Sequence, residues 1–157
     1  MAAKSFSSEL DIASARSDSD DMIRTIDAYA AYWVETDGAS DWPEDQEDAF
    51  GQICGGLNDD PNKALTYVVL GASRSDHPGF IACLGCGPLE DILREPSEEM
   101  IQRIVAEARK SARFRWLLSH PFKVAVSEAA WLAIERFRIT GPHEEPPLET
   151  MPTSYFG

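Results

Sequence analysis

A ten-residue stretch, LGCGPLEDIL, constrains the fold more than any other part of the chain, because it places two glycines and a proline inside an apolar pattern. Gly85 and Gly87 can adopt the left-handed backbone conformation that ends a helix, and Pro88 suits the first position of a new one. Glu90 and Asp91 then fall in the first turn of that new helix, where its dipole favours carboxylates. The stretch therefore predicts an abrupt corner at which one helix ends and its neighbour begins.

Apolar residues recur at steps of three and four along most of the chain, which is the spacing of one face of a helix. Asp, Ser and Pro precede several of these runs, as they do at helix starts. The pattern predicts helices over about 20–37, 41–57, 61–72, 78–84, 97–109, 114–118 and 128–137, in addition to the short helix that begins at Pro88. We expect an all-α fold, a compact bundle of about seven short helices, with stacked helical hairpins as one possible arrangement.

The length of 157 residues and the hydrophobic content of 43% suit one domain with a single core. Residues 1–17 have no helical period, and we expect a flexible N-terminal arm there. Residues 18–141 should form the helical domain. Residues 142–157 contain several prolines and should be either flexible or packed as an extended tail.

The net charge of -13 is concentrated in the first part of the chain. Residues 1–60 hold 15 Asp and Glu against three Lys and Arg, whereas residues 61–157 hold 12 against 11. Such a charge repels nucleic acids and anionic membranes, so we expect neither as a partner. Two interpretations stay open: the acids lie against the basic residues of 101–138 within the chain, or they are kept for a basic partner protein.

The acids are densest around one tryptophan. We identify five residues there as candidates for binding a partner: Trp42, Glu44, Asp45, Glu47 and Asp48. A tryptophan exposed among acids would anchor an interface, whereas a buried one would belong to the core.

The chain carries three cysteines, an odd number, and begins without the apolar run of a signal peptide. No stretch approaches the roughly 18 apolar residues of a membrane-spanning helix. We expect a cytoplasmic protein with reduced thiols.

Three segments carry a family resemblance: GPLEDIL at 87–93, IQRI at 101–104 and ARFRWLL at 112–118. Together they resemble a bacterial family of small helical proteins known only as a domain of unknown function. The similarity runs from about Tyr32 to Phe137, and its most specific part is the Gly-Pro-Leu-Glu-Asp corner with the Arg-Phe-Arg segment. The resemblance implies a compact helical fold and brings no activity or catalytic residue. The chain departs from the pattern at Cys86, where a small residue such as Ala is expected.

The charged residues of the corner favour a structural role. Glu90 and Asp91 are adjacent, so they point in different directions from a helix and do not form a catalytic acid pair. We predict that one of them caps the helix or forms an ion pair with Arg113 or Arg115, which would hold the corner in place. The alternative is a small-molecule or hydrolase site assembled from Glu90, Arg113, Arg115 and a cysteine.

Cys83 and Cys86 have the two-residue gap of a redox pair or of half a zinc site. A second ligand pair is missing, and Cys54, His77 and His120 would have to converge to supply it. We therefore expect buried structural thiols, histidines at the surface or in loops, and no metal or cofactor. The chain also lacks the serine motif of esterases and a phosphate-binding loop, so no catalytic residue is predicted.

These observations favour a non-enzymatic protein-interaction module, such as an immunity protein or an adaptor, whose contact surface is the acidic region 35–60. Association with a second copy of the chain is a further possibility.

Overall fold

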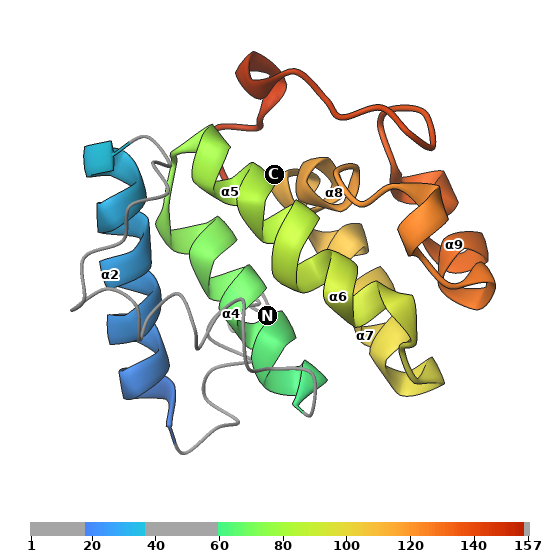
Figure 1. Ribbon diagram of the computed structural model, residues 1–157, viewed down its shortest axis with the longest axis horizontal. Helices are drawn as coiled ribbons and strands as arrows, with labels where there is room; N and C mark the ends of the chain where they lie inside the picture. Colours follow the sequence, from blue (N-terminus) through green and yellow to red (C-terminus); the bar gives the residue numbers. More distant parts are fainter. Residues whose placement is uncertain (1–17, 37–59, 156–157) are drawn as a thin grey trace, which may run out of the picture.

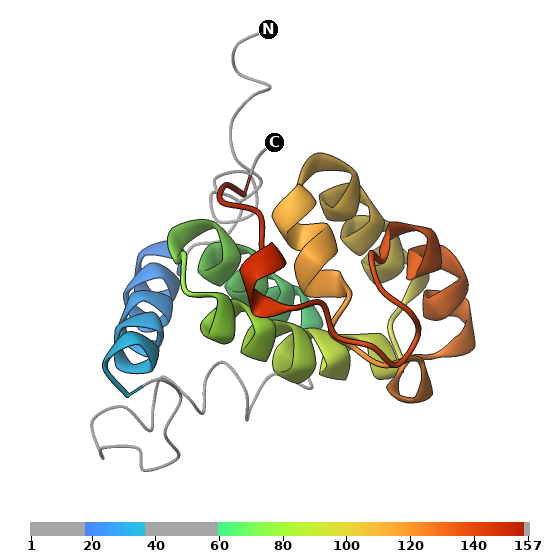
Figure 2. The same ribbon diagram turned by 90° about the horizontal axis from the view of Figure 1, so that it is seen from above.

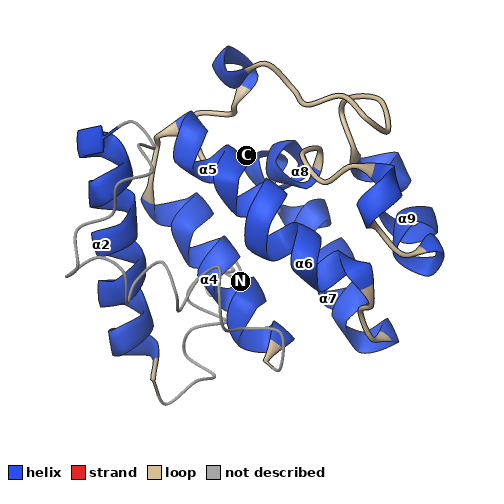
Figure 3. Ribbon diagram, in the orientation of Figure 1, coloured by secondary structure: helices blue, strands red, loops and turns tan. Residues whose placement is uncertain are grey.

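The computed structural model describes residues 18–36 and 60–155, and the regular structure within these ranges is entirely helical (Figure 3). The predicted all-α fold is confirmed. The α-helices are α2 (Ser19–Thr36), α4 (Pro61–Arg74), α5 (Pro78–Leu84), α6 (Glu90–Arg94), α7 (Glu98–Lys110), α8 (Ala112–Leu118) and α9 (Glu128–Ile134). Shorter helical turns are η3 (Gly85–Leu89), η4 (Lys123–Ala125), η5 (Glu135–Phe137) and η6 (Leu148–Thr150).

Several predictions lie outside the described residues. These are the N-terminal arm 1–17, the helix over 41–57, Cys54, and the candidate contact residues Trp42, Glu44, Asp45, Glu47 and Asp48.

Side chains just before the helices cap their first turns, as the start signals in the sequence predict. Asp60 accepts a hydrogen bond from the Lys63 amide at 3.0 Å at the start of α4. Ser97, Ser111 and Ser127 accept the equivalent bond at the starts of α7, α8 and α9. Each cap satisfies an N–H group that has no partner within its helix, which stabilises a helix by about 1 kcal/mol.

The predicted corner is wrong, because α5, η3 and α6 form one continuous helix. Gly85 has φ -70° and ψ -44°, and Leu89 has φ -67° and ψ -42°, which are right-handed helical values. Pro88 lies inside η3, a turn of π-helix. The wider turn of a π-helix accommodates a residue that has no N–H group and whose ring would collide with an α-helical carbonyl. The chain therefore passes Pro88 without changing direction.

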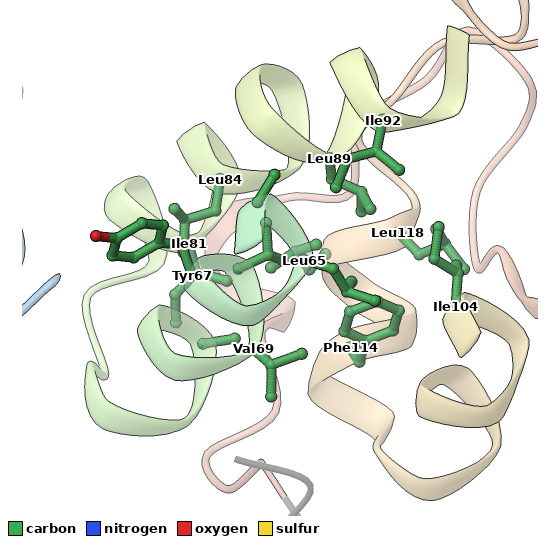
Figure 4. Packing of buried hydrophobic residues seen from close by; sticks show 14 of the residues in the cluster. Leu65, Tyr67, Val69, Ile81, Leu84, Leu89, Ile92, Ile104, Phe114 and Leu118 are labelled. Atoms are coloured by element: carbon green, nitrogen blue, oxygen red, sulfur yellow. The ribbon is translucent and has the colours of Figure 1, made fainter. Parts of the chain in front are cut away.

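This continuous helix runs across the molecule over α4 and α8 (Figure 1). On one side, α2 packs against α4 and α5, and on the other, α7 packs against α8 and α9. Helix α4 is central, and its residues 64–72 are all buried. Figure 4 shows side chains of α4, such as Leu65, among those of α5, η3, α7 and α8. Burying one such side chain stabilises the fold by about 1.5–3 kcal/mol.

Residues 142–155 form what we call the C-terminal strap, an extended segment that returns from α9 across the molecule towards α5 (Figures 1 and 2). The Trp116 indole donates a hydrogen bond to Thr150 Oγ1 at 3.0 Å. Tyr155 is only 3% exposed, and its hydroxyl donates to Glu107 Oε2 at 2.6 Å. The strap therefore supplies polar partners to α7 and α8.

Candidate functional site

Arg113 is the most deeply buried charged group among the described residues, with 1% of its side chain exposed. Its Nη1 donates to the carbonyls of Ala72 at 3.0 Å and Ser75 at 2.8 Å, and its Nε donates to that of Pro152 at 2.9 Å. Its Nη2 donates to Asp76 Oδ1 at 3.0 Å. Four of its five N–H groups are therefore engaged, and Arg113 joins α4, α8 and the C-terminal strap as a structural residue.

The predicted ion pair between the acids of the corner and Arg113 or Arg115 is wrong. Glu90 and Asp91 instead lie 3.9 Å and 3.6 Å from the guanidinium of Arg94. Arg115 donates to a backbone carbonyl of α7 at 2.6 Å. Because the chain stays helical after Pro88, Arg94 is the cation that lies three and four residues further along the same face.

Gly85 does not end a helix, as the sequence analysis predicts, but allows close packing between two helices. A Cβ atom at Gly85 would lie 2.6 Å from the carbonyl oxygen of Leu117 and 2.9 Å from Cβ of His120. The absence of a side chain therefore lets the continuous helix approach α8 closely, and no left-handed turn is involved. Gly87 and Pro88 lie in the same π-helical turn, with Pro88 buried.

The two described thiols are poor nucleophiles. Burial raises the pKa of Cys83, whose sulfur lies 3.8 Å from the Tyr29 hydroxyl. Desolvation of its sulfur, a hydrogen bond to Glu145 Oε1 at 3.2 Å and the charges of Glu145 and Glu90 raise the pKa of Cys86 to about 12. Both thiols therefore stay protonated near neutral pH, whereas the thiolate is the reactive form. Cys83 is half-buried and Cys86 exposed, which corrects the expectation that both are buried.

His120 belongs to the core, which corrects the expectation of a surface or loop histidine. It is 2% exposed, and its ring lies edge-on to Trp116 with the centroids 4.4 Å apart. Nδ1 lies 3.1 Å and 3.2 Å from the carbonyl oxygens of Trp116 and Leu117. Burial lowers the pKa of His120. His77 accepts a hydrogen bond from the Phe80 amide and caps α5.

The structure thus does not assemble the alternative site from Glu90, Arg113, Arg115 and a cysteine. Glu90 contributes to the pKa of Cys86, but Arg113 and Arg115 are bonded elsewhere. No three His, Cys, Asp or Glu side chains among the described residues come together as a metal site would require. Within the same ranges, no helix has the length and apolar character needed to span a bilayer.

A groove of about 880 Å³ was not predicted from the sequence. It lies between the starts of α4 and α7, the end of the continuous helix, and the segment that contains η4. We call it the proline groove. Its larger apolar lining residues are Pro61, Pro88, Ile92, Pro96, Val124 and Val126. Its charged lining residues are Asp91, Arg94 and Glu95.

The only feature of the sequence that could have pointed to this groove is its set of prolines. Each of Pro61, Pro88 and Pro96 can be recognised in the sequence as a helix start, but nothing in their spacing indicates that they meet. Their convergence depends on the continuous helix, which carries Pro88 and the acids past the start of α4.

The comparisons with known proteins place the chain in a family and no further. Neither the curated proteins nor the solved structures include one that matches the chain. A family model described as a family of unknown function (DUF6869) matches residues 25–141, which is most of the chain and spans α2 to η5. The chain therefore belongs to this family of unknown function.

Proposed function

We propose that the protein is a non-catalytic protein-binding module of the immunity or adaptor type, and that its partner in the cytoplasm is a basic protein. The single observation that carries this proposal is the use that the fold makes of its arginines. Arg113, Arg115 and Arg138 all donate to backbone carbonyls. Among the Lys and Arg of 101–138, only Arg113 forms an ion pair with another described residue.

Among the described residues, the basic region 101–138 thus offers the acids a single ion pair, between Arg113 and Asp76. This supports the interpretation in which the acids are kept for a partner. An arginine whose donors are used on backbone carbonyls has few left for an ion pair with a distant acid, and exposed charges more than about 10 Å apart interact only weakly at ordinary salt concentration. The spare negative charge therefore favours association with a positively charged surface.

We place the contact surface in the acidic region 35–60, as the sequence suggests. The residues proposed to carry it are Trp42, Glu44, Asp45, Glu47 and Asp48. The acids would steer a basic partner, and the tryptophan would anchor it.

Affinity capture with the full chain as bait tests the proposal. The captured protein is identified and purified, and its affinity for the wild type is compared with that for a variant in which Glu44, Asp45, Glu47 and Asp48 are changed to the corresponding amides. We expect at least a tenfold loss of affinity, because four steering charges are removed.

A matched variant controls for net charge alone. It carries Asp20→Asn, Glu135→Gln, Glu144→Gln and Glu149→Gln, four exposed acids on α2, on η5 and in the strap. It should bind nearly as tightly as the wild type. Equal losses in the two variants, a partner that is itself acidic, or turnover of a substrate by the protein would contradict the proposal.

A further inference from the structure

We infer that the proline groove binds an extended segment of the partner protein, one that carries apolar side chains and a lysine or arginine. This inference rests on the proposed function and adds a second contact, on described residues outside the acidic region 35–60.

The groove has an apolar floor and an apolar rim. Ile92 and Ala64 on its floor are 7% and 3% exposed. Val124 on its rim is 82% exposed, the highest value among the large apolar side chains of the described residues. Water leaves such surface when another apolar chain covers it, and this burial favours binding by roughly 25 cal/mol per Å².

The walls of the groove are held in place before anything binds. The Ser127 amide donates to the Leu93 carbonyl at 2.9 Å, which ties the segment containing η4 to the end of α6. Pro61, Pro88 and Pro96 have fixed φ angles. A preformed groove loses little conformational entropy on binding, so a short segment can bind to it.

The charges of the groove select a cation. The charged residues that line the groove are two acids, Asp91 and Glu95, and one cation, Arg94. Arg94 already forms ion pairs with Asp91 and Glu90. Glu95 forms no ion pair with any other described residue, and its side chain is exposed at the groove. A lysine or arginine of the occupant would find its partner there.

Helix N-termini attract anions, but those at the groove do not reverse its preference for a cation. Ser97 caps α7, and Glu98 and Glu99 occupy its first turn, where they offset the positive end of the helix dipole. Glu128 has the same position in α9. An anionic occupant would therefore meet carboxylates at both of these helix starts, and the third helix start at the groove, that of α4, is capped by the carboxylate of Asp60.

The open rim favours a chain segment over a small molecule. Small-molecule sites enclose about 70–90% of their ligand. Here Val124, Arg94 and Glu95 are all exposed, so an extended chain can enter along the rim and leave again.

Selection of a displayed library of random peptides on the full chain tests the inference. Enriched peptides are synthesised, and their affinities are measured by fluorescence anisotropy. We expect a consensus of apolar residues with one or more lysines or arginines. Val124→Ser should weaken binding about fivefold and Glu95→Lys about tenfold, since each removes one rim contact.

Matched variants elsewhere on the surface provide the controls. Leu132 is 71% exposed on α9 and does not line the groove, and Glu149 is exposed in η6. Leu132→Ser and Glu149→Lys should leave the affinity unchanged. No enriched peptide, an acidic consensus, or affinities that Val124→Ser and Glu95→Lys leave at the wild-type value would overturn the inference. The proposed function fails separately, through the capture experiment on residues 44–48.

Discussion

Arg113 shows how one cation can hold three parts of a chain together. Its guanidinium bonds to carbonyls at the end of α4 and in the strap, and to Asp76 between α4 and α5. A planar group with several donors in fixed directions suits this task better than lysine does. The carbonyls it satisfies would otherwise be polar acceptors without partners, which is costly inside a protein.

Arg113→Met should lower the free energy of unfolding by about 3 kcal/mol, because the substitution leaves carbonyls of Ala72, Ser75 and Pro152 without this donor. Urea unfolding at neutral pH measures the loss. Asp76→Asn is the control, and it should cost less than about 1 kcal/mol, because the Asp76 side chain is 88% exposed. Equal losses would mean that the ion pair, and not the set of carbonyls, holds Arg113.

His120 should make stability depend on pH. Its pKa is lowered in the folded state from the ordinary value of 6.5, so the unfolded chain takes up a proton that the folded chain resists. The contribution of His120 is therefore present above pH 6.5 and is lost as the pH falls towards the folded-state pKa. Urea unfolding at several pH values between neutral and mildly acidic should show a shallower decline for His120→Asn.

His143→Asn is the control for this measurement, because His143 is exposed in the strap. It should leave the pH dependence as in the wild type. A wild-type decline that persists unchanged in His120→Asn would show that another group controls the acid sensitivity.

At the level of elements, the continuous helix from α5 to α6 sets the shape of the molecule. It covers α4, approaches α8 at Gly85, and brings Pro88 and Asp91 to the groove. A π-helical turn within it is the local device that keeps Pro88 in line with the rest.

Gly85→Ala should destabilise the protein by about 2 kcal/mol, because the new Cβ would collide with the backbone oxygen of Leu117 and force the two helices apart. Thermal and urea unfolding both measure this. Gly141→Ala should be nearly neutral, since a Cβ there would meet only Glu144 at 3.7 Å. If Gly85→Ala were neutral too, the close approach of the two helices would not need glycine.

The helices could be predicted from the sequence, whereas the contacts between them could not. The spacing of Met22, Ile26 and Tyr29 reports one buried face of α2, and this information is local. Gly85 and Pro88 are ambiguous, because glycine and proline occur at helix ends and also where a helix is closely packed or locally widened. For Gly85, the position of Leu117, distant in sequence, decides between these possibilities.

The candidate site was harder to predict for the same reason. The sequence suggests Arg113 as a residue with a structural ion pair, but its partners lie near residues 72–76 and 152. The pairing was predicted with the wrong acids because the corner that would have presented them does not exist. The proline groove depends on three helix ends that meet only after folding.

For the whole molecule, the charge of -13 implies self-repulsion in the folded state. Raising the salt concentration from about 0.02 M to about 0.5 M should therefore raise the midpoint of thermal unfolding, because screening shortens the range of repulsion from about 20 Å to about 4 Å. Differential scanning calorimetry measures the shift. The variant with four amides at 44–48 should show a smaller shift, and a midpoint that falls with salt would mean that attractive pairs dominate.

The strap has a consequence for the synthesis of the protein. A nascent chain that has left the ribosome only as far as α8 already contains Arg113 and Trp116, but it lacks Thr150 and Pro152, to which they bond. Until those residues emerge, the Arg113 Nε and the Trp116 indole lack the acceptors that the strap supplies, although α4, α5 and α7 are already present to pack against α8. Pro152 lies 39 residues after Arg113, so that length of chain must emerge before the surroundings of Arg113 are complete.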